Sequence, residues 1–166
     1  MPGHGRGNAD SHFALPRVSA SVEELRAADF VPFRALNDCP LGMTAHVVYE
    51  ALDPDAPGTT SAFVIENTIR GEIGFEGLLL TDDLSMNALQ GSLAERAKAA
   101  LAAGCDIVTH CNGRIDEMEQ VASEVRPLEG EPLRRAQATL SRRHAPKAFD
   151  AAAAEARLAE LLGVSA

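Results

Sequence analysis

The chain of 166 residues is long enough for one stable domain with its own core. Hydrophobic residues make up 46% and charged residues 23% of it, which is typical of a soluble globular protein and excludes wholesale disorder. The net charge of -9 argues against a nucleic-acid partner, because phosphate backbones bind clustered Lys and Arg. No apolar run approaches the ~20 residues of a membrane span, so we also expect no membrane partner.

The first third of the chain predicts a loop, a helix and a strand. Residues 1–19 contain three Gly and two Pro and have no helical or strand period, so they predict a loop rich in His and Asp. Ser21 and Glu24 have the spacing of a capping box, which opens a helix. The apolar run Leu41–Val48 follows Pro40 and predicts a buried strand.

The middle of the chain predicts two further helices and two further strands. A proline-rich turn at 53–58 leads to a helix that starts near Ser61 and carries Val64, Ile65, Ile69 and Ile73 at helical spacing, with Gly74 suited to its end. The run Gly77–Thr81 predicts a buried strand that ends at Asp82 and Asp83. A second capping box, Ser92 with Glu95, opens an alanine-rich helix that ends at Gly104, and Ile107–Thr109 predicts a third strand.

The rest of the chain predicts only helices, over Ile115–Val125, Glu131–Arg143 and Asp150–Leu162. The alternation of strands and helices before them predicts an α/β fold with parallel strands. Three strands do not close a (β/α)8 TIM barrel, which takes eight strands and roughly 250 residues. We therefore predict part of a barrel over residues 1–125, with about its last three strands, and a helical tail over 126–166.

Polar residues gather where each predicted strand ends, which in a parallel sheet is one edge. A carboxylate there, Asp82 or Asp83, suits attack on a sugar's anomeric carbon, although either could instead cap the following turn. Asp10 stands two residues from His12 and could polarise its imidazole, unless the two are an ordinary surface pair. His46 is either a ligand or a hydrogen-bonded structural histidine.

The cysteines and histidines predict no metal. Cys39, Cys105 and Cys111 are an odd number without a close pair, so we expect buried reduced thiols rather than a disulfide framework or a zinc site. The histidines lack ligand spacing on a helix, and the glycine-rich start precedes no strand–turn–helix unit. We expect no cofactor.

Several segments together resemble one family. P-G-H-G-R followed by D-S-H and L-P is similar to the acid/base loop of bacterial β-N-acetylglucosaminidases (β-hexosaminidases) of glycoside hydrolase family 3. MTAHVVYEALDPDAPGTTS resembles the next strand and turn, GFEGLLLTDDLSM the nucleophile segment, and AGCDIVTHCNG the last barrel strand. The resemblance covers residues 2–113.

The resemblance implies a cytoplasmic retaining hydrolase that removes terminal β-linked N-acetylglucosamine from peptidoglycan-derived muropeptides in cell-wall recycling. It assigns Asp82 as the nucleophile, His12 as the acid/base and Asp10 as its polarising partner. Chitin-type sugars and transfer to phosphate stay open. The sugar pocket would include positions equivalent to His46, Met86 and Asn112.

The chain departs from the family at its start. The family has a sugar-binding Lys-His pair just before P-G-H-G, and Met1 stands directly after that position. We therefore expect the first half of the barrel to be absent, Met1 to be an internal methionine of a longer protein, and the fragment to be inactive without that half as its partner. The alternative is a non-catalytic half-barrel with a structural or partner-binding role.

Overall fold

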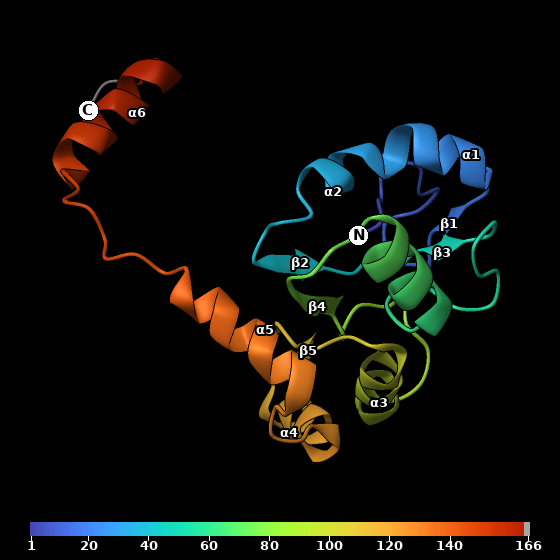
Figure 1. Cartoon of the computed structure of the whole chain (residues 1–166). Coiled ribbons are helices and arrows are strands. Elements are labelled where there is room, and N and C mark those ends of the chain that lie inside the picture. The colour runs from blue at the N-terminus through green and yellow to red at the C-terminus, as the bar shows by residue number, and fades with distance from the viewer. Residues whose placement is uncertain (165–166) are drawn as a thin grey trace.

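Two small parallel sheets organise the chain in the computed structural model, which describes residues 1–164 (Figure 1). One sheet pairs β1 (Arg17–Val18) with β3 (Val48–Tyr49). The other has the order β2-β4-β5, with β2 at Leu41–Met43, β4 at Leu78–Asp83 and β5 at Ile107–Thr109. The α/β class with parallel strands is confirmed.

The apolar run at 41–48 is not one buried strand, and that prediction was wrong. It changes neighbours along its length: β2 pairs with β4, whereas β3 pairs with β1. Leu41 and Met43 are about half exposed, while residues 44–48 are buried. The strand β1 also interrupts the predicted loop at 1–19, because two residues are too few to show a period in the sequence.

Both capping boxes form as predicted. Ser21 opens α1 (Val22–Glu24), which continues through the π-helical segment η1 (Leu25–Asp29) into α2 (Val31–Ala35). Ser92 opens α3 (Leu93–Ala103), which ends at Gly104 with φ 109°, a backbone angle that favours glycine. Local side-chain capping therefore fixes the start of these helices.

The predicted helix after Ser61 is confirmed, but most of it is the π-helical segment η2 (Val64–Glu72). Its last turn has the wider winding, since Ile73 N–H donates to the Thr68 carbonyl at 2.8 Å. Apolar spacing does not distinguish this winding from an α-helix. The remaining predicted helices also form, as α4 (Ile115–Glu124), α5 (Gly130–Ser141) and α6 (Ala151–Leu162).

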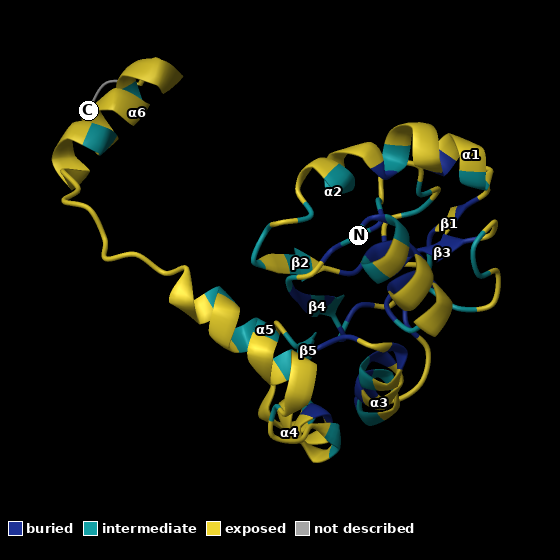
Figure 2. Ribbon diagram, viewed as in Figure 1, coloured by how far each residue is buried: buried dark blue, intermediate teal, exposed yellow. Residues whose placement is uncertain are grey.

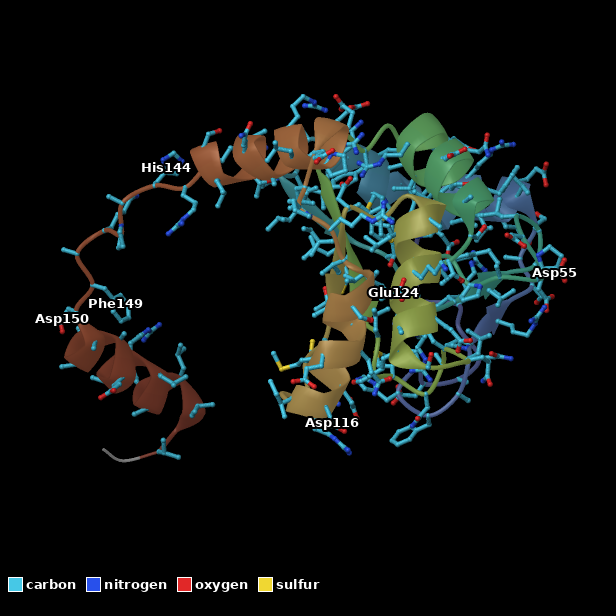
Figure 3. The ribbon with its side chains drawn as sticks, turned by 90° about the horizontal axis from the view of Figure 1, so that it is seen from below. Asp55, Asp116, Glu124, His144, Phe149 and Asp150 are labelled. Carbon is cyan, nitrogen blue, oxygen red and sulfur yellow. The ribbon has the colours of Figure 1, made fainter. Side chains whose placement is uncertain are left out.

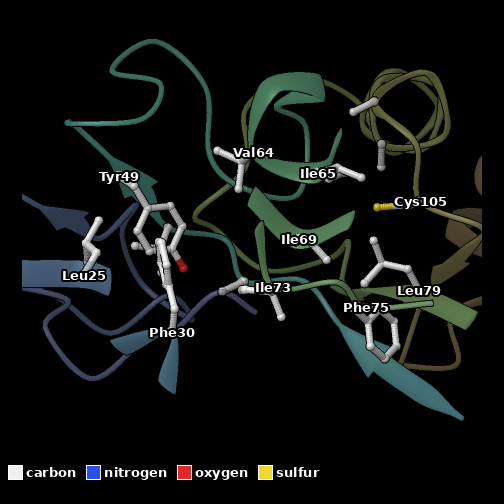
Figure 4. Packing of buried hydrophobic residues seen from close by; sticks show 14 of the residues in the cluster. Leu25, Phe30, Tyr49, Val64, Ile65, Ile69, Ile73, Phe75, Leu79 and Cys105 are labelled. Atoms are coloured by element: carbon white, nitrogen blue, oxygen red, sulfur yellow. The ribbon is translucent and has the colours of Figure 1, made fainter. Parts of the chain in front are cut away.

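The main core lies between the sheets and the helical segments η1 and η2. Its large buried side chains are Leu25, Phe30, Tyr49, Val64, Ile65, Ile69, Ile73, Phe75 and Leu79, with Cys105 beside them (Figure 4). A second cluster of Leu84, Leu89, Leu93, Ala97 and Val121 joins the turn after β4 to α3 and α4. The second cluster packs behind the polar ends of β4 and β5 and supports them.

A buried carboxylate fastens α5 to the opposite end of the sheet. Asp106, whose side chain is 2% exposed, accepts hydrogen bonds from Arg135 at 3.0 Å, from Arg70 at 2.9 Å and from Leu79 N–H at 2.9 Å. Thr139 of α5 also donates to the Pro40 carbonyl at 2.8 Å. These contacts hold α5 against the sheet.

Helix α6, in contrast, lies apart from the rest of the chain. The connection from His144 to Asp150 runs outward, and Phe149 on it is exposed (Figure 3). Almost every residue of α6 is exposed (Figure 2). The division into residues 1–125 and 126–166 stays a prediction.

The cysteines differ in their surroundings, and all three are free thiols. Cys105 is buried as predicted, and Cys39 is half-buried. Cys111 is exposed, because it follows β5 at the polar edge and not in the core. Within residues 1–164, every helix is too short or too polar to cross a bilayer.

Candidate functional site

The predicted acidic residues, Asp82 and Asp83, form the carboxyl end of β4, and Asp83 also contacts the segment that follows β5. Asp83 carries the structural contacts: one carboxylate oxygen accepts from Ser85 N–H at 3.0 Å and from Cys111 N–H at 3.2 Å, and the other accepts from the Ser85 hydroxyl at 2.6 Å. Partial burial alone would raise the pKa of Asp83, but these hydrogen bonds outweigh it and hold the pKa below its ordinary value. Asp83 therefore caps the turn, as the alternative interpretation predicted.

Asp82 is half-buried and less constrained. Its Oδ1 accepts from Asp83 N–H at 2.8 Å, and no group in residues 1–164 donates to its Oδ2. The cap of the next helix is Ser92, ten residues later. Asp82 thus has no capping role at that helix and presents one free carboxylate oxygen.

Asp10 and His12 form a close pair in the first loop. The Asp10 carboxylate accepts from His12 N–H at 2.9 Å and lies 2.8 Å from its Nδ1. The hydrogen bonds from the His12 backbone, and then from its ring, hold the pKa of Asp10 below its ordinary value. With Nδ1 occupied and the His12 side chain 71% exposed, Nε2 is the ring nitrogen available for proton transfer.

The loop that carries this pair is fixed to the rest of the fold at several points. Asn87 donates from its side chain to the His12 carbonyl at 3.0 Å, and Tyr49 donates to the Gly3 carbonyl at 2.8 Å. The Asn87 contact spans 75 positions and joins the loop to the turn that follows Asp82. The sequence interpretation missed Asn87 and Tyr49, since an amide in a turn and the chain's one tyrosine gave no sign of their partners.

His46 lies beneath the site and is fully buried. Its Nδ1 is 2.7 Å from the Thr59 hydroxyl and its Nε2 is 3.0 Å from the Asp83 carbonyl. Burial lowers the pKa of His46 and favours the neutral ring. The geometry supports the structural interpretation of this histidine over a ligand.

Asn112 and Met86 lie at the same edge of the sheet, but only Asn112 is exposed. The Asn112 amide donates to Glu117 at 2.6 Å and accepts from Arg114 N–H at 2.9 Å, so it organises the start of α4. Met86 is buried in the turn after β4. Sugar binding by His46, Met86 and Asn112 stays a prediction.

A cavity of about 750 Å³ lies elsewhere, between α3, β5 and the α4–α5 connection. It is lined mainly by apolar side chains, including Leu101, Val108 and Pro127, and lacks the carboxylates of the site. Among the described residues no group of three or more His, Cys, Asp or Glu side chains is arranged to hold a metal ion. The chemistry is therefore best sought at the surface beside Asp82.

Comparisons with known proteins agree on one family. The model for the "Glycosyl hydrolase family 3 N terminal domain" matches residues 1–142. The β-hexosaminidase of Tolumonas auensis is 43% identical over 148 residues, which are 85% of this chain and 42% of that relative. The β-hexosaminidase of Alkalilimnicola ehrlichii is 49% identical over 116 residues, which are 68% of this chain and 33% of that relative.

Solved structures give the same result. A glycoside hydrolase family 3 β-N-acetylglucosaminidase from Paenibacillus sp. str. FPU-7 has a TM-score of 0.74 at 30% identity. The match covers 91% of this chain and 32% of the Paenibacillus chain. Native NagZ from Neisseria gonorrhoeae has a TM-score of 0.72 at 34% identity, and the match covers 98% of this chain and 46% of the NagZ chain. The chain thus spans less than half the length of these relatives.

Proposed function

The chain belongs to glycosyl hydrolase family 3, and from this premise we propose that it carries the catalytic residues of a retaining β-N-acetylglucosaminidase. The names of its relatives support a substrate that contains N-acetylglucosamine. The observation that carries the proposal is the hydrogen bond from Asn87 to His12, which joins the acid/base loop to the turn after Asp82.

In the proposed first step, the free carboxylate oxygen of Asp82 attacks the anomeric carbon of the sugar. The glycosidic C–O bond breaks, and the leaving oxygen takes the proton from Nε2 of the His12 imidazolium. The product is a glycosyl ester on Asp82. In the second step, water gives a proton to His12 Nε2 and attacks the same carbon, and the Asp82 carboxylate is released.

The Asp10–His12 contact suits this exchange of roles. The Asp10 carboxylate fixes Nδ1–H as a donor, which stabilises the imidazolium and directs Nε2 to the reacting oxygen. After the first step the imidazole is neutral and does not repel an incoming anion. Transfer to phosphate is therefore a second outcome that the same residues permit.

We further propose that the two parallel sheets form part of one barrel wall, and that the active protein needs the remaining strands. Leu41 and Met43 on β2 are half exposed, as expected where a wall lacks its neighbours. The substrate would be a peptidoglycan-derived muropeptide, processed in the cytoplasm during cell-wall recycling. The rival proposal is a half-barrel without catalysis that binds a partner.

The test uses a chimera, here called the replacement protein. In it, this chain takes the place of the matching residues of the Tolumonas auensis β-hexosaminidase. A fluorinated N-acetylglucosamine-type inactivator should label Asp82 in it, as read by peptide mapping. Asp82→Asn should lower kcat at least 1000-fold, or about 4 kcal/mol in barrier. Asp55→Asn, at an exposed carboxylate in the turn at 53–58, is the matched control and should keep full activity.

Label on Asp83, or no label in a folded replacement protein, would contradict the nucleophile assignment. An inactive replacement protein that folds cooperatively would favour the non-catalytic rival. Release of sugar phosphate in phosphate buffer would identify the phosphorolytic variant.

A further inference from the structure

A series of hydrogen bonds runs from the buried interior to Asp82. The Thr44 hydroxyl is 2.9 Å from the Thr59 hydroxyl, which is 2.7 Å from His46 Nδ1. His46 Nε2 in turn is 3.0 Å from the Asp83 carbonyl, and all three side chains are buried. The Asp83 N–H then donates to Asp82 Oδ1 at 2.8 Å.

The direction of each hydrogen bond follows from the groups involved. A carbonyl oxygen only accepts, so His46 Nε2 carries the proton and donates it to Asp83. A neutral ring then has an unprotonated Nδ1, which accepts from the Thr59 hydroxyl, and Thr59 accepts from Thr44. In this arrangement the Thr59 hydroxyl and both ring nitrogens of His46 have hydrogen-bond partners, which fixes the tautomer of His46.

We propose that Thr44, Thr59 and His46 form a relay that positions the nucleophile through the backbone of Asp83, so that His46 is a positioning residue and not a sugar ligand. This inference rests on the proposed function of Asp82. The relay holds the carbonyl of residue 83, while the Asp83 carboxylate is held by Ser85 and Cys111. Residue 83 is thereby fixed on both sides, and its N–H fixes one oxygen of Asp82.

The relay also explains why histidine occupies a site with no exposed surface. It connects parts of the chain that pair with different neighbours: Thr44 and His46 lie between β2 and β3, Thr59 precedes η2, and Asp83 ends β4. An unpaired polar group in such a place is destabilising, so the relay acts as a unit.

Two matched pairs of variants test the proposal in the replacement protein. Thr59→Val removes the hydroxyl at nearly constant shape, while Thr59→Ser keeps it. His46→Leu removes the donor to the Asp83 carbonyl. His46→Gln keeps a side-chain N–H at a similar distance from the backbone of residue 46. We expect Thr59→Val and His46→Leu to lower kcat about tenfold or more, and Thr59→Ser and His46→Gln to retain most of it.

The Michaelis constant and the inhibition constant of N-acetylglucosamine should stay within about twofold in all four variants, because no relay residue contacts the sugar. A rise in both constants at unchanged kcat would make His46 a sugar ligand and overturn the proposal. Equal activity of Thr59→Val and Thr59→Ser would overturn the relay.

Nitrogen-15 NMR of labelled histidine separates this inference from the proposed function. In the replacement protein, His46 should show a protonated Nε2 and an unprotonated Nδ1. Thr59→Val should disturb this pattern and Thr59→Ser should not. If the replacement protein folds but has no activity, the proposed function fails, and a proton on Nδ1 in the unmodified sequence would refute the relay on its own.

Discussion

Replacing His12 by alanine in the replacement protein should reduce turnover in a way that depends on the leaving group. His12 is the proposed proton donor, and its Nε2 is the available ring nitrogen because Asp10 occupies Nδ1 at 2.8 Å. Substrates with poor leaving groups, such as alkyl glycosides, need that proton, whereas activated aryl glycosides leave without it. The two substrate classes therefore respond differently to the same variant.

The expected size of the effect follows from general acid catalysis. Proton transfer by a positioned side chain typically contributes 100- to 10,000-fold, or about 3 to 5 kcal/mol of barrier, so alkyl glycosides should lose that much in kcat/KM. Aryl glycosides should lose less than about tenfold in the first step. Because the His12 side chain is 71% exposed, its removal should hardly change the free energy of unfolding, so the loss is chemical.

Asp10→Asn gives a graded version of this experiment. The asparagine oxygen can still accept from His12 N–H, but it no longer bears the charge that stabilises the imidazolium. We expect the same dependence on the leaving group, with a loss smaller than that of His12→Ala. Equal losses on alkyl and aryl substrates for His12→Ala would refute its role as the acid.

Two further predictions concern stability, both measured by urea unfolding of the replacement protein. Asp106→Ala removes a buried carboxylate that two partly buried guanidinium groups share, and it should lower the free energy of unfolding by about 3 to 5 kcal/mol, whereas Asp116→Ala, at an exposed ion pair, should leave it unchanged. The hydrogen bond from Ser61 lowers the pKa of Asp53 in the folded state, so its contribution is present above pH ~3.9 and is lost as the pH falls through the folded value. The stability difference between the unmodified protein and Asp53→Asn should therefore shrink below pH ~3.9, and a constant difference would contradict this linkage.

The sequence predicts what short-range chemistry determines. Both capping boxes lie within four residues, and both open helices where expected. Asp10 and His12 are two positions apart, so their contact also follows from the local chain. These features need no information about distant partners.

Long-range contacts decide the features that the sequence did not reveal. The run at 41–48 divides into two strands because its halves meet different neighbours, and apolar residues alone do not say which. The Asn87–His12 contact joins residues 75 positions apart. His46 falls late in the predicted strand at 41–48, yet its ring points to Thr59 in the interior, and an apolar run does not predict that direction.

The last prediction concerns the 166 residues by themselves. β2 pairs with β4 on one side, and on the other side no described strand pairs with it, although its Met43 carbonyl accepts from the Met1 amino group at 2.5 Å. β5 pairs with β4 alone among the described strands. Unpaired strand edges promote association with other chains. We therefore expect the isolated chain to dimerise, aggregate or melt without cooperativity, and to release no N-acetylglucosamine from aryl glycosides.

Leu41 and Met43 permit an estimate of what the open face costs. Burying one such side chain completely stabilises a protein by about 1.5 to 3 kcal/mol, so leaving both half exposed forfeits about 2 kcal/mol, a sizeable part of the stability of a small domain. Leu41→Lys should reduce self-association in light scattering, since charge blocks strand edges, whereas Leu140→Lys on the exposed face of α5 should not. A cooperatively folded monomer that turns over substrate with these residues alone would show that the open wall needs no further strands.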